Sequence, residues 1–134
     1  MNNYRKSSRR GGAVVEAAVI LPVIAIIAFG IMECQNAIHL QQSITICAYE
    51  GARVSILPNT NSGNVEETCN LLLEARGITS ANVTVNPNNF DALPIGTPIE
   101  VSISANLADN SISQFVISGG QQLSAAVTMM KETE

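Results

Sequence analysis

The sequence predicts an α+β protein in which one long N-terminal helix spans a membrane. The outer half of this helix is expected to pack on a short helix and a small antiparallel sheet of about three strands. Two patterns predict this: a nearly uncharged apolar run close to the N-terminus, and alternating apolar segments confined to the second half of the chain. A chain of 134 residues fits one domain with a modest core. Aromatic residues make up only 4% of it, so aliphatic side chains must supply most of the burial.

The long helix is predicted over residues 13–57. Residues 13–32 carry Glu16 as their only charge, and as a helix they would be about 30 Å long, which matches the hydrocarbon core of a bilayer. Beyond them no proline occurs before Pro58, and apolar residues keep a helical spacing. One stripe along this outer half consists of Leu40, Ile44, Cys47, Gly51 and Val54. Pro22 is expected to bend or loosen the membrane-spanning part.

The remaining chain is predicted to form a small head over residues 58–134. PNTNSGN at 58–64 reads as a turn-rich linker, and a short helix is expected at 65–76, with Glu66 and Glu67 in its first turn and Gly77 as its C-cap. Three segments then favour strands: ANVTVN, PIEVSISANL and QLSAAVTMMK. The predicted organisation is a basic leader at 1–11, a membrane segment at 12–32, an outer helical segment at 33–57, and the head.

The charges are distributed asymmetrically. Four of the seven basic residues lie within the first ten positions, whereas all 11 acidic residues follow Gly12. Basic residues before a span place its N-terminus in the cytoplasm, so the head is expected on the opposite side of the membrane. The acidic balance beyond the leader disfavours nucleic acid as a partner. Because no A-x-A pattern follows the span, cleavage after it is not expected, and an uncleaved signal anchor remains one reading.

Glu16 is the most informative residue, because a carboxylate within an apolar span is costly. A cut between Gly11 and Gly12 would create an α-amine four residues before it, on the same face of the helix. Glu16 would then pair with its own terminus or with that of an adjacent copy, which lowers the cost of both charges in lipid. The alternative is that Glu16 lies at headgroup level and reaches water.

These features together resemble a known family. The stretch that carries the resemblance is RRGGAVVEAAVILPVIAIIAFGIMECQNAIHLQQSITICAYEGAR. It is similar to the N-terminal region of the TadE-like proteins, minor pseudopilins of the tight-adherence (Flp-type) branch of type IV pili. The matching features are the basic leader, the glycine cut site, the glutamate in fifth position after it, the Leu21-Pro22 pair, Phe29-Gly30, Glu33 and AYEGAR. One departure is Ala17, where this family often has an aromatic residue.

The resemblance implies a noncatalytic structural subunit of a pilus used for surface adhesion or secretion. A prepilin peptidase would remove the leader, and Glu16 would guide docking by meeting the N-terminus of a neighbouring subunit. The implied partners are that peptidase, other pilin or pseudopilin subunits, the inner-membrane assembly platform and membrane lipid. The implied location is the inner membrane, and after assembly the extracellular pilus. The competing interpretation is an uncleaved single-pass anchor whose head binds another envelope protein.

Other candidates for chemistry are weaker. Cys34, Cys47 and Cys69 are expected outside the cytoplasm, where a Cys47–Cys69 disulfide would tie the long helix to the short one; three buried thiols are the alternative. His39 is the only histidine, and no metal-ligand spacing surrounds it, so neither a metal nor another cofactor is expected. Glu50 and Arg53 are spaced for a modest helix-surface pair. No nucleophile or phosphate-loop motif is present, and enzymatic activity is therefore not expected.

Overall fold

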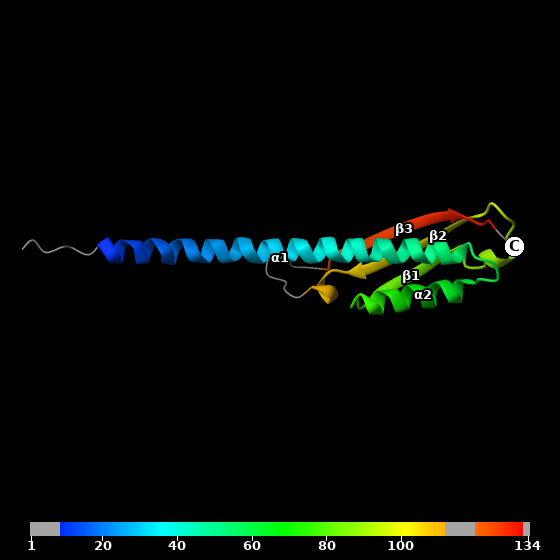
Figure 1. Cartoon of the computed structure of the whole chain (residues 1–134), viewed down its shortest axis with the longest axis horizontal. Coiled ribbons are helices and arrows are strands. Elements are labelled where there is room, and N and C mark those ends of the chain that lie inside the picture. Colours follow the sequence, from blue (N-terminus) through cyan, green and yellow to red (C-terminus); the bar gives the residue numbers. More distant parts are fainter. Residues whose placement is uncertain (1–8, 112–119, 133–134) are drawn as a thin grey trace, which may run out of the picture.

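The computed structural model of the chain describes residues 9–111 and 120–132, and the predicted leader residues 1–8 lie outside this range. A 47-residue helix, α1 (Arg9–Ser55), runs the length of the molecule (Figure 1). The other elements gather beside its C-terminal half. They are α2 (Ser62–Ala75), β1 (Ala81–Asn86), η1 (Phe90–Ala92), β2 (Pro98–Asn106), η2 (Ala108–Asn110) and β3 (Gln122–Met130). The predicted α+β class, with its long N-terminal helix, short helix and three-stranded sheet, is confirmed.

The helix α1 begins earlier and ends slightly earlier than predicted. It starts at Arg9, so its first turn includes the end of the predicted leader. It ends at Ser55, because Pro58 disfavours helical backbone at the residue before it, and the amide of Leu57 instead closes a turn onto the carbonyl of Val54 at 3.0 Å. The helix runs without interruption from the apolar segment into the head, because Pro22 is the only proline between its two ends.

The short helix α2 starts at Ser62, three residues before the predicted start, and this is a correction to the predicted linker. The Asn61 side chain caps it by accepting a hydrogen bond from the amide of Asn64 at 3.0 Å. As a result Glu66 and Glu67 lie in the second turn, and the first turn contains no acid.

The C-terminal end of α2 lies one residue earlier than predicted: the helix ends at Ala75, Arg76 is its C-cap, and the predicted cap Gly77 is the next residue. Gly77 follows the last residues of the helix with a positive φ of 69°. The amide of Gly77 binds the carbonyl of Glu74, and the amide of Ile78 binds that of Leu73, both at 2.9 Å. These two bonds form a Schellman motif, in which only glycine adopts the required left-handed backbone at low cost.

The sheet is antiparallel, with strand order β1-β2-β3. Its register aligns apolar residues in rows across the three strands; Val85, Val101 and Val127 form one such row, and Val83, Ile103 and Ala125 form the next. Because side chains alternate along a strand, these rows share one face, and the opposite face carries mainly serine, threonine and asparagine. The sheet is therefore built to be covered on one side only.

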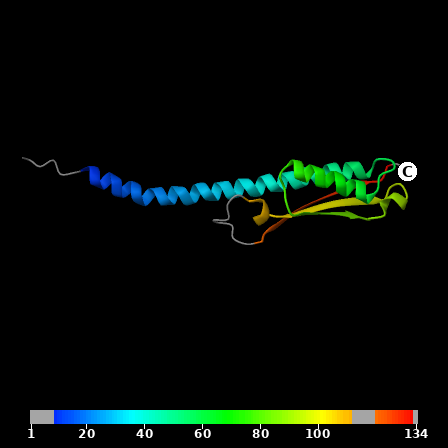
Figure 2. The ribbon, with the colours of Figure 1, turned by 90° about the horizontal axis from the view of Figure 1, so that it is seen from below.

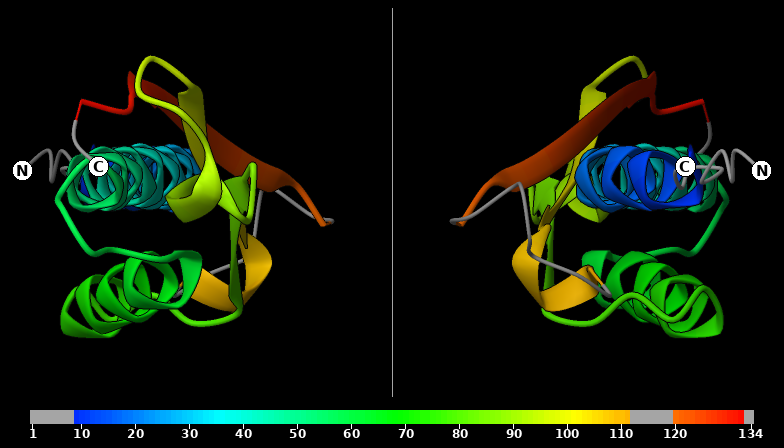
Figure 3. Two further views of the ribbon diagram at one scale, coloured as in Figure 1. Left: turned by 90° about the vertical axis from the view of Figure 1, so that its right-hand side faces the viewer. Right: turned by 90° about the vertical axis from the view of Figure 1, so that its left-hand side faces the viewer.

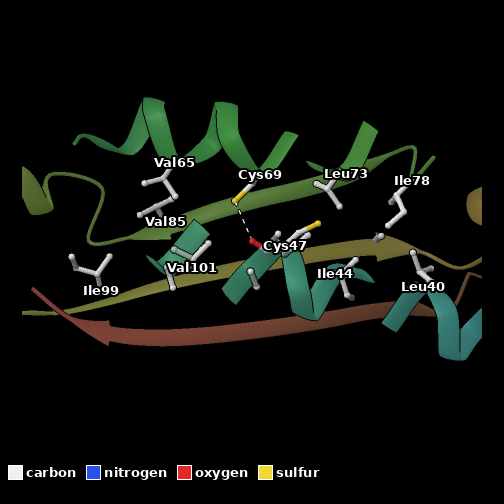
Figure 4. Packing of buried hydrophobic residues seen from close by; sticks show 14 of the residues in the cluster. Leu40, Ile44, Cys47, Val65, Cys69, Leu73, Ile78, Val85, Ile99 and Val101 are labelled. Carbon is white, nitrogen blue, oxygen red and sulfur yellow. Dashed lines mark hydrogen bonds between the residues drawn. The ribbon is translucent and has the colours of Figure 1, made fainter. Parts of the chain in front are cut away.

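The two helices cover that apolar face. Seen along the long axis, α1 and α2 lie side by side in one layer and the sheet forms the second (Figure 3). Side chains from both helices and the sheet meet between the layers (Figure 4), and Ile44, Cys47, Cys69, Ile99 and Ile103 are completely buried there. The predicted stripe on α1 thus contributes to the core, with Val54 at its partly buried margin.

Candidate functional site: the exposed half of the long helix

The N-terminal half of α1 has no partner within the described part of the molecule. The helix is long and apolar enough to cross a membrane, and none of its most apolar stretch is buried. Large aliphatic side chains project on all sides of it, and most are more than half exposed: Val15, Val19, Leu21, Ile24, Ile27 and Ile31 are examples. A helix that is apolar all round is stable in lipid or among other helices. This half of α1 is therefore the surface on which any membrane or assembly role depends.

The predicted processing and docking residues lie together at the start of this surface. Gly11 and Gly12 belong to the first turn of α1, and a side chain at Gly12 would meet nothing within 4 Å. Glu16 is exposed one turn further along. Because residues 12 and 16 are four apart in a continuous helix, they share a face, as the pairing hypothesis requires. Arg9 is the first helical residue, whereas Arg5 and Lys6 lie outside the described residues.

Pro22 lies inside α1, and the helix continues through it. Figure 2 shows that the N-terminal, blue part of α1 leaves the line of the rest of the helix. A proline removes one backbone hydrogen bond and crowds the preceding turn, which accounts for a bend in this part. The bend changes the direction of the first turns, including Glu16, relative to the rest of α1.

The cysteines occupy two different environments. Cys34 is exposed just beyond the apolar span, whereas Cys47 and Cys69 are buried, and all three are free thiols in the structure. The thiol of Cys69 donates to the main-chain carbonyl of Cys47 at 3.7 Å, and Figure 4 shows the Cys47 sulfur directed away from it. The two residues therefore adjoin, as the predicted link between the helices requires, and the disulfide itself stays a prediction.

Thiol reactivity should separate these environments. Burial, with smaller contributions from Cys47 and Glu66, raises the pKa of Cys69 from 9.0 to about 11. Burial also raises the pKa of Cys47, although the charge of Arg76 opposes it. We expect iodoacetamide at pH 8 to add one group to the folded, reduced protein, at Cys34, and three after unfolding, as read by intact mass. Rapid triple labelling without unfolding would contradict the buried placement.

The same raised pKa values set a pH dependence of stability. The unfolded thiols ionise first, so their contribution to the free energy of unfolding is complete below pH 9 and is lost as the pH rises from about 9 to 11. Unfolding without prior reduction tests the disulfide: one alkylation instead of three, mapped to Cys34 by peptide mass, would establish a Cys47–Cys69 bond.

Several polar residues have roles that the sequence pattern did not reveal. Lys131 is 8% exposed, and its Nζ donates to the carbonyls of Asp91 and Leu93, both at 2.8 Å, so it holds the η1 segment against the end of β3. Glu33 is 2% exposed although it directly follows the span. A charge pattern alone does not distinguish such residues from ordinary surface charges, because their burial depends on segments distant in the chain.

The remaining predicted polar residues stay on the surface. His39 is exposed on α1, and Arg53 lies 3.7 Å from Glu50 in a solvent-exposed pair, which contributes little to stability. Within the described ranges no three His, Cys, Asp or Glu side chains form a group that could hold a metal ion.

The fold and its exposed helix fit one class: a single-pass membrane protein with an N-terminal apolar helix and a small α+β head. Comparison with protein families then gives the more particular result. The model of the TadE-like protein family matches residues 11–53, so the N-terminal helix is similar to that family. The match confirms the resemblance, and it fits a membrane protein associated with the Tad pilus. No curated protein and no solved structure matches the chain.

Proposed function

We propose that this chain is a pseudopilin-like structural subunit that a prepilin peptidase processes between Gly11 and Gly12. The processed subunit then takes part in assembly of a tight-adherence (Flp-type) pilus for adhesion or secretion. The observation that carries this proposal is the family match, which begins at Gly11 and runs along the exposed helix that contains Glu16. The proposed role is structural and not enzymatic.

The position of the two glycines supports processing at this point. A peptidase binds its substrate as an extended backbone, so the first turn of α1 has to unwind before cleavage. Each glycine lowers helix stability by about 1 kcal/mol relative to alanine, and Gly11 and Gly12 stand next to each other in that turn. The end of a helix also frays more easily than its middle. The bond between them thus costs less to expose than a bond in the middle of α1.

The exposed surface of α1 supports assembly. In the inner membrane, with its N-terminus in the cytoplasm, this half of the helix contacts lipid; in a pilus it would pack on the same half of other pilin or pseudopilin subunits. Glu16 would meet the new α-amine of an adjacent subunit, and the bend near Pro22 would help the first turns to reach it. The prepilin peptidase and the membrane assembly platform are the proposed partners in these steps.

The first test is the N-terminus and intact mass of the protein extracted from membranes, with and without a prepilin peptidase in the cells. We expect the chain to begin at Gly12 when the peptidase is present and to retain Arg9 and Arg10 when it is absent. Substitution of Gly11 by a bulky residue such as Leu should block the cut, whereas substitution at Gly30, a helical glycine far from the bond, should leave it unchanged.

A chain that retains both arginines in all cells would overturn the processing route. That result would favour the competing interpretation, a permanent single-pass anchor whose head binds another envelope protein.

A further inference from the structure

The membrane-proximal end of the head contains a pocket of about 340 Å³ with a mixed lining, in which Leu40 and Ile78 supply apolar surface. Gln35, Asn36 and His39 line it from α1, Arg76 from the end of α2, and Asn110 from η2. Its described lining contains no acidic residue. The pocket is therefore a place where one positive charge and several polar groups converge from three elements.

The chain direction of α2 brings Arg76 to this position. Figure 1 shows α2 running back along α1 from the far tip of the head toward the membrane segment, and its C-terminal end faces that segment. Arg76 is the C-cap residue, and the left-handed Gly77 turns the chain away immediately after it. The helix end thus stops beside the first turns of α1 that emerge from the apolar span.

The pocket lies at the depth expected of lipid headgroups. The apolar run ends at Met32, and Gln35 and His39 follow it by about 4.5 and 10 Å along the helix axis. The headgroup region extends roughly 5 to 8 Å beyond the hydrocarbon core on each side. Gln35 therefore falls within the layer of phosphate groups, and His39 lies at its outer border.

The donors of the pocket are available to a ligand. The guanidinium of Arg76 has no carboxylate within 4 Å among the described residues, and the side chains of Gln35 and His39 make no hydrogen bond within the same ranges. Asn110 is held in place, since its amide donates to the carbonyl of Thr79 at 2.9 Å. Asn110 is therefore held in one position in the lining of the pocket. The polar side chains of Arg76, Gln35 and His39 beside it can bind a ligand.

We propose that this pocket binds the phosphate of an anionic phospholipid headgroup in the leaflet on the side of the head. The planar guanidinium of Arg76 donates two hydrogen bonds to phosphate oxygens, and Gln35 and His39 donate to the remaining oxygens. Such binding would fix the height and rotation of the head over the membrane. It depends on the membrane span alone and is independent of processing or pilus assembly.

The test uses the full chain in nanodiscs of phosphatidylcholine with or without phosphatidylglycerol, and the lipid retained by the protein is counted by native mass spectrometry. We expect the wild type to retain phosphatidylglycerol preferentially. Arg76→Gln should lower that retention at least about fivefold, since a charge-assisted hydrogen-bonded pair is lost. Arg53→Gln, at an exposed arginine farther from the membrane, should retain as much as the wild type.

Two results would overturn the proposal. One is equal retention by wild type and Arg76→Gln, or no preference for phosphatidylglycerol in the wild type. The other is complete displacement of the lipid by millimolar inorganic phosphate, which would make free phosphate the ligand. If Arg76→Gln fails to fold, Arg76→Lys supplies the comparison: it keeps the charge and loses the bidentate geometry, so an intermediate retention is expected and unchanged retention contradicts the proposed geometry.

Discussion

Gly51→Val is expected to be the most destabilising single substitution in the head. A side chain at this position would meet the Sγ of Cys69 from α2, and it would lie 3.2 Å from Cγ1 of Val101 on β2. At Gly51, α1 therefore lies in close contact with both α2 and β2. Overpacking of a tight core costs up to about 3 kcal/mol, and for a domain of this size that corresponds to a fall in melting temperature of roughly 15 °C.

Thermal unfolding in detergent, followed by circular dichroism, measures this effect. Gly30→Val is the matched control, because Gly30 lies in the same helix and a side chain there meets nothing within 4 Å. A second variant identifies the cause. If the clash is with the Cys69 sulfur, Gly51→Ala should destabilise the wild type but be neutral or stabilising in a Cys69→Ala background, since alanine favours the helix by about 1 kcal/mol. Equal effects in both backgrounds would contradict the contact.

Hydrophobic periodicity predicted the larger part of this fold. The alternation of apolar residues along β2 correctly predicted which face of the strand is buried. The four residues of that face are at most 1% exposed: Ile99, Val101, Ile103 and Ala105. The helical spacing of Leu40, Ile44 and Cys47 likewise placed the face of α1 that contacts the sheet. These patterns are reliable because one-sided burial dictates the side-chain period of each element.

Local sequence was a poorer guide to where elements begin. The serine, glycine and asparagine of 62–64 favour turns, yet they form the first turn of α2 because Asn61 caps it and Val65 packs in the core. Tertiary packing overrides weak propensities of this kind.

The pocket around Arg76 could not be predicted from the sequence for a different reason. Arg76 and His39 come together only because α2 turns back along α1. The spacing of residues along the sequence does not indicate this arrangement of the two helices. The proposed processing and docking residues, by contrast, lie close together in the sequence and within one continuous helix, so their spacing could be considered from the sequence alone; their roles stay predictions.

Glu16→Gln is expected to have the largest effect on function. In the proposed assembly, the carboxylate of Glu16 and the α-amine of a processed neighbour meet in lipid, where each charge alone costs about 2.5 to 3.5 kcal/mol. Glutamine keeps the size of the side chain but removes its charge. The positively charged α-amine of the neighbouring subunit would then have no negative partner at the docked position. Loss of about 3 kcal/mol corresponds to a factor of roughly 100 in docking, and we expect at least about a tenfold loss of assembled pili.

The readout is the amount of pilus sheared from cells, together with the amount and N-terminus of the subunit in the membrane. The membrane level and the head's thermal stability should be unchanged, because Glu16 is exposed on α1 and far from the core. Glu16→Asp is the informative companion: it keeps the charge on a shorter side chain and should recover part of the assembly. Wild-type pilus levels with Glu16→Gln would show that the carboxylate does not pair with a neighbour, and Glu16 would then be an acid that only reaches water at the membrane surface.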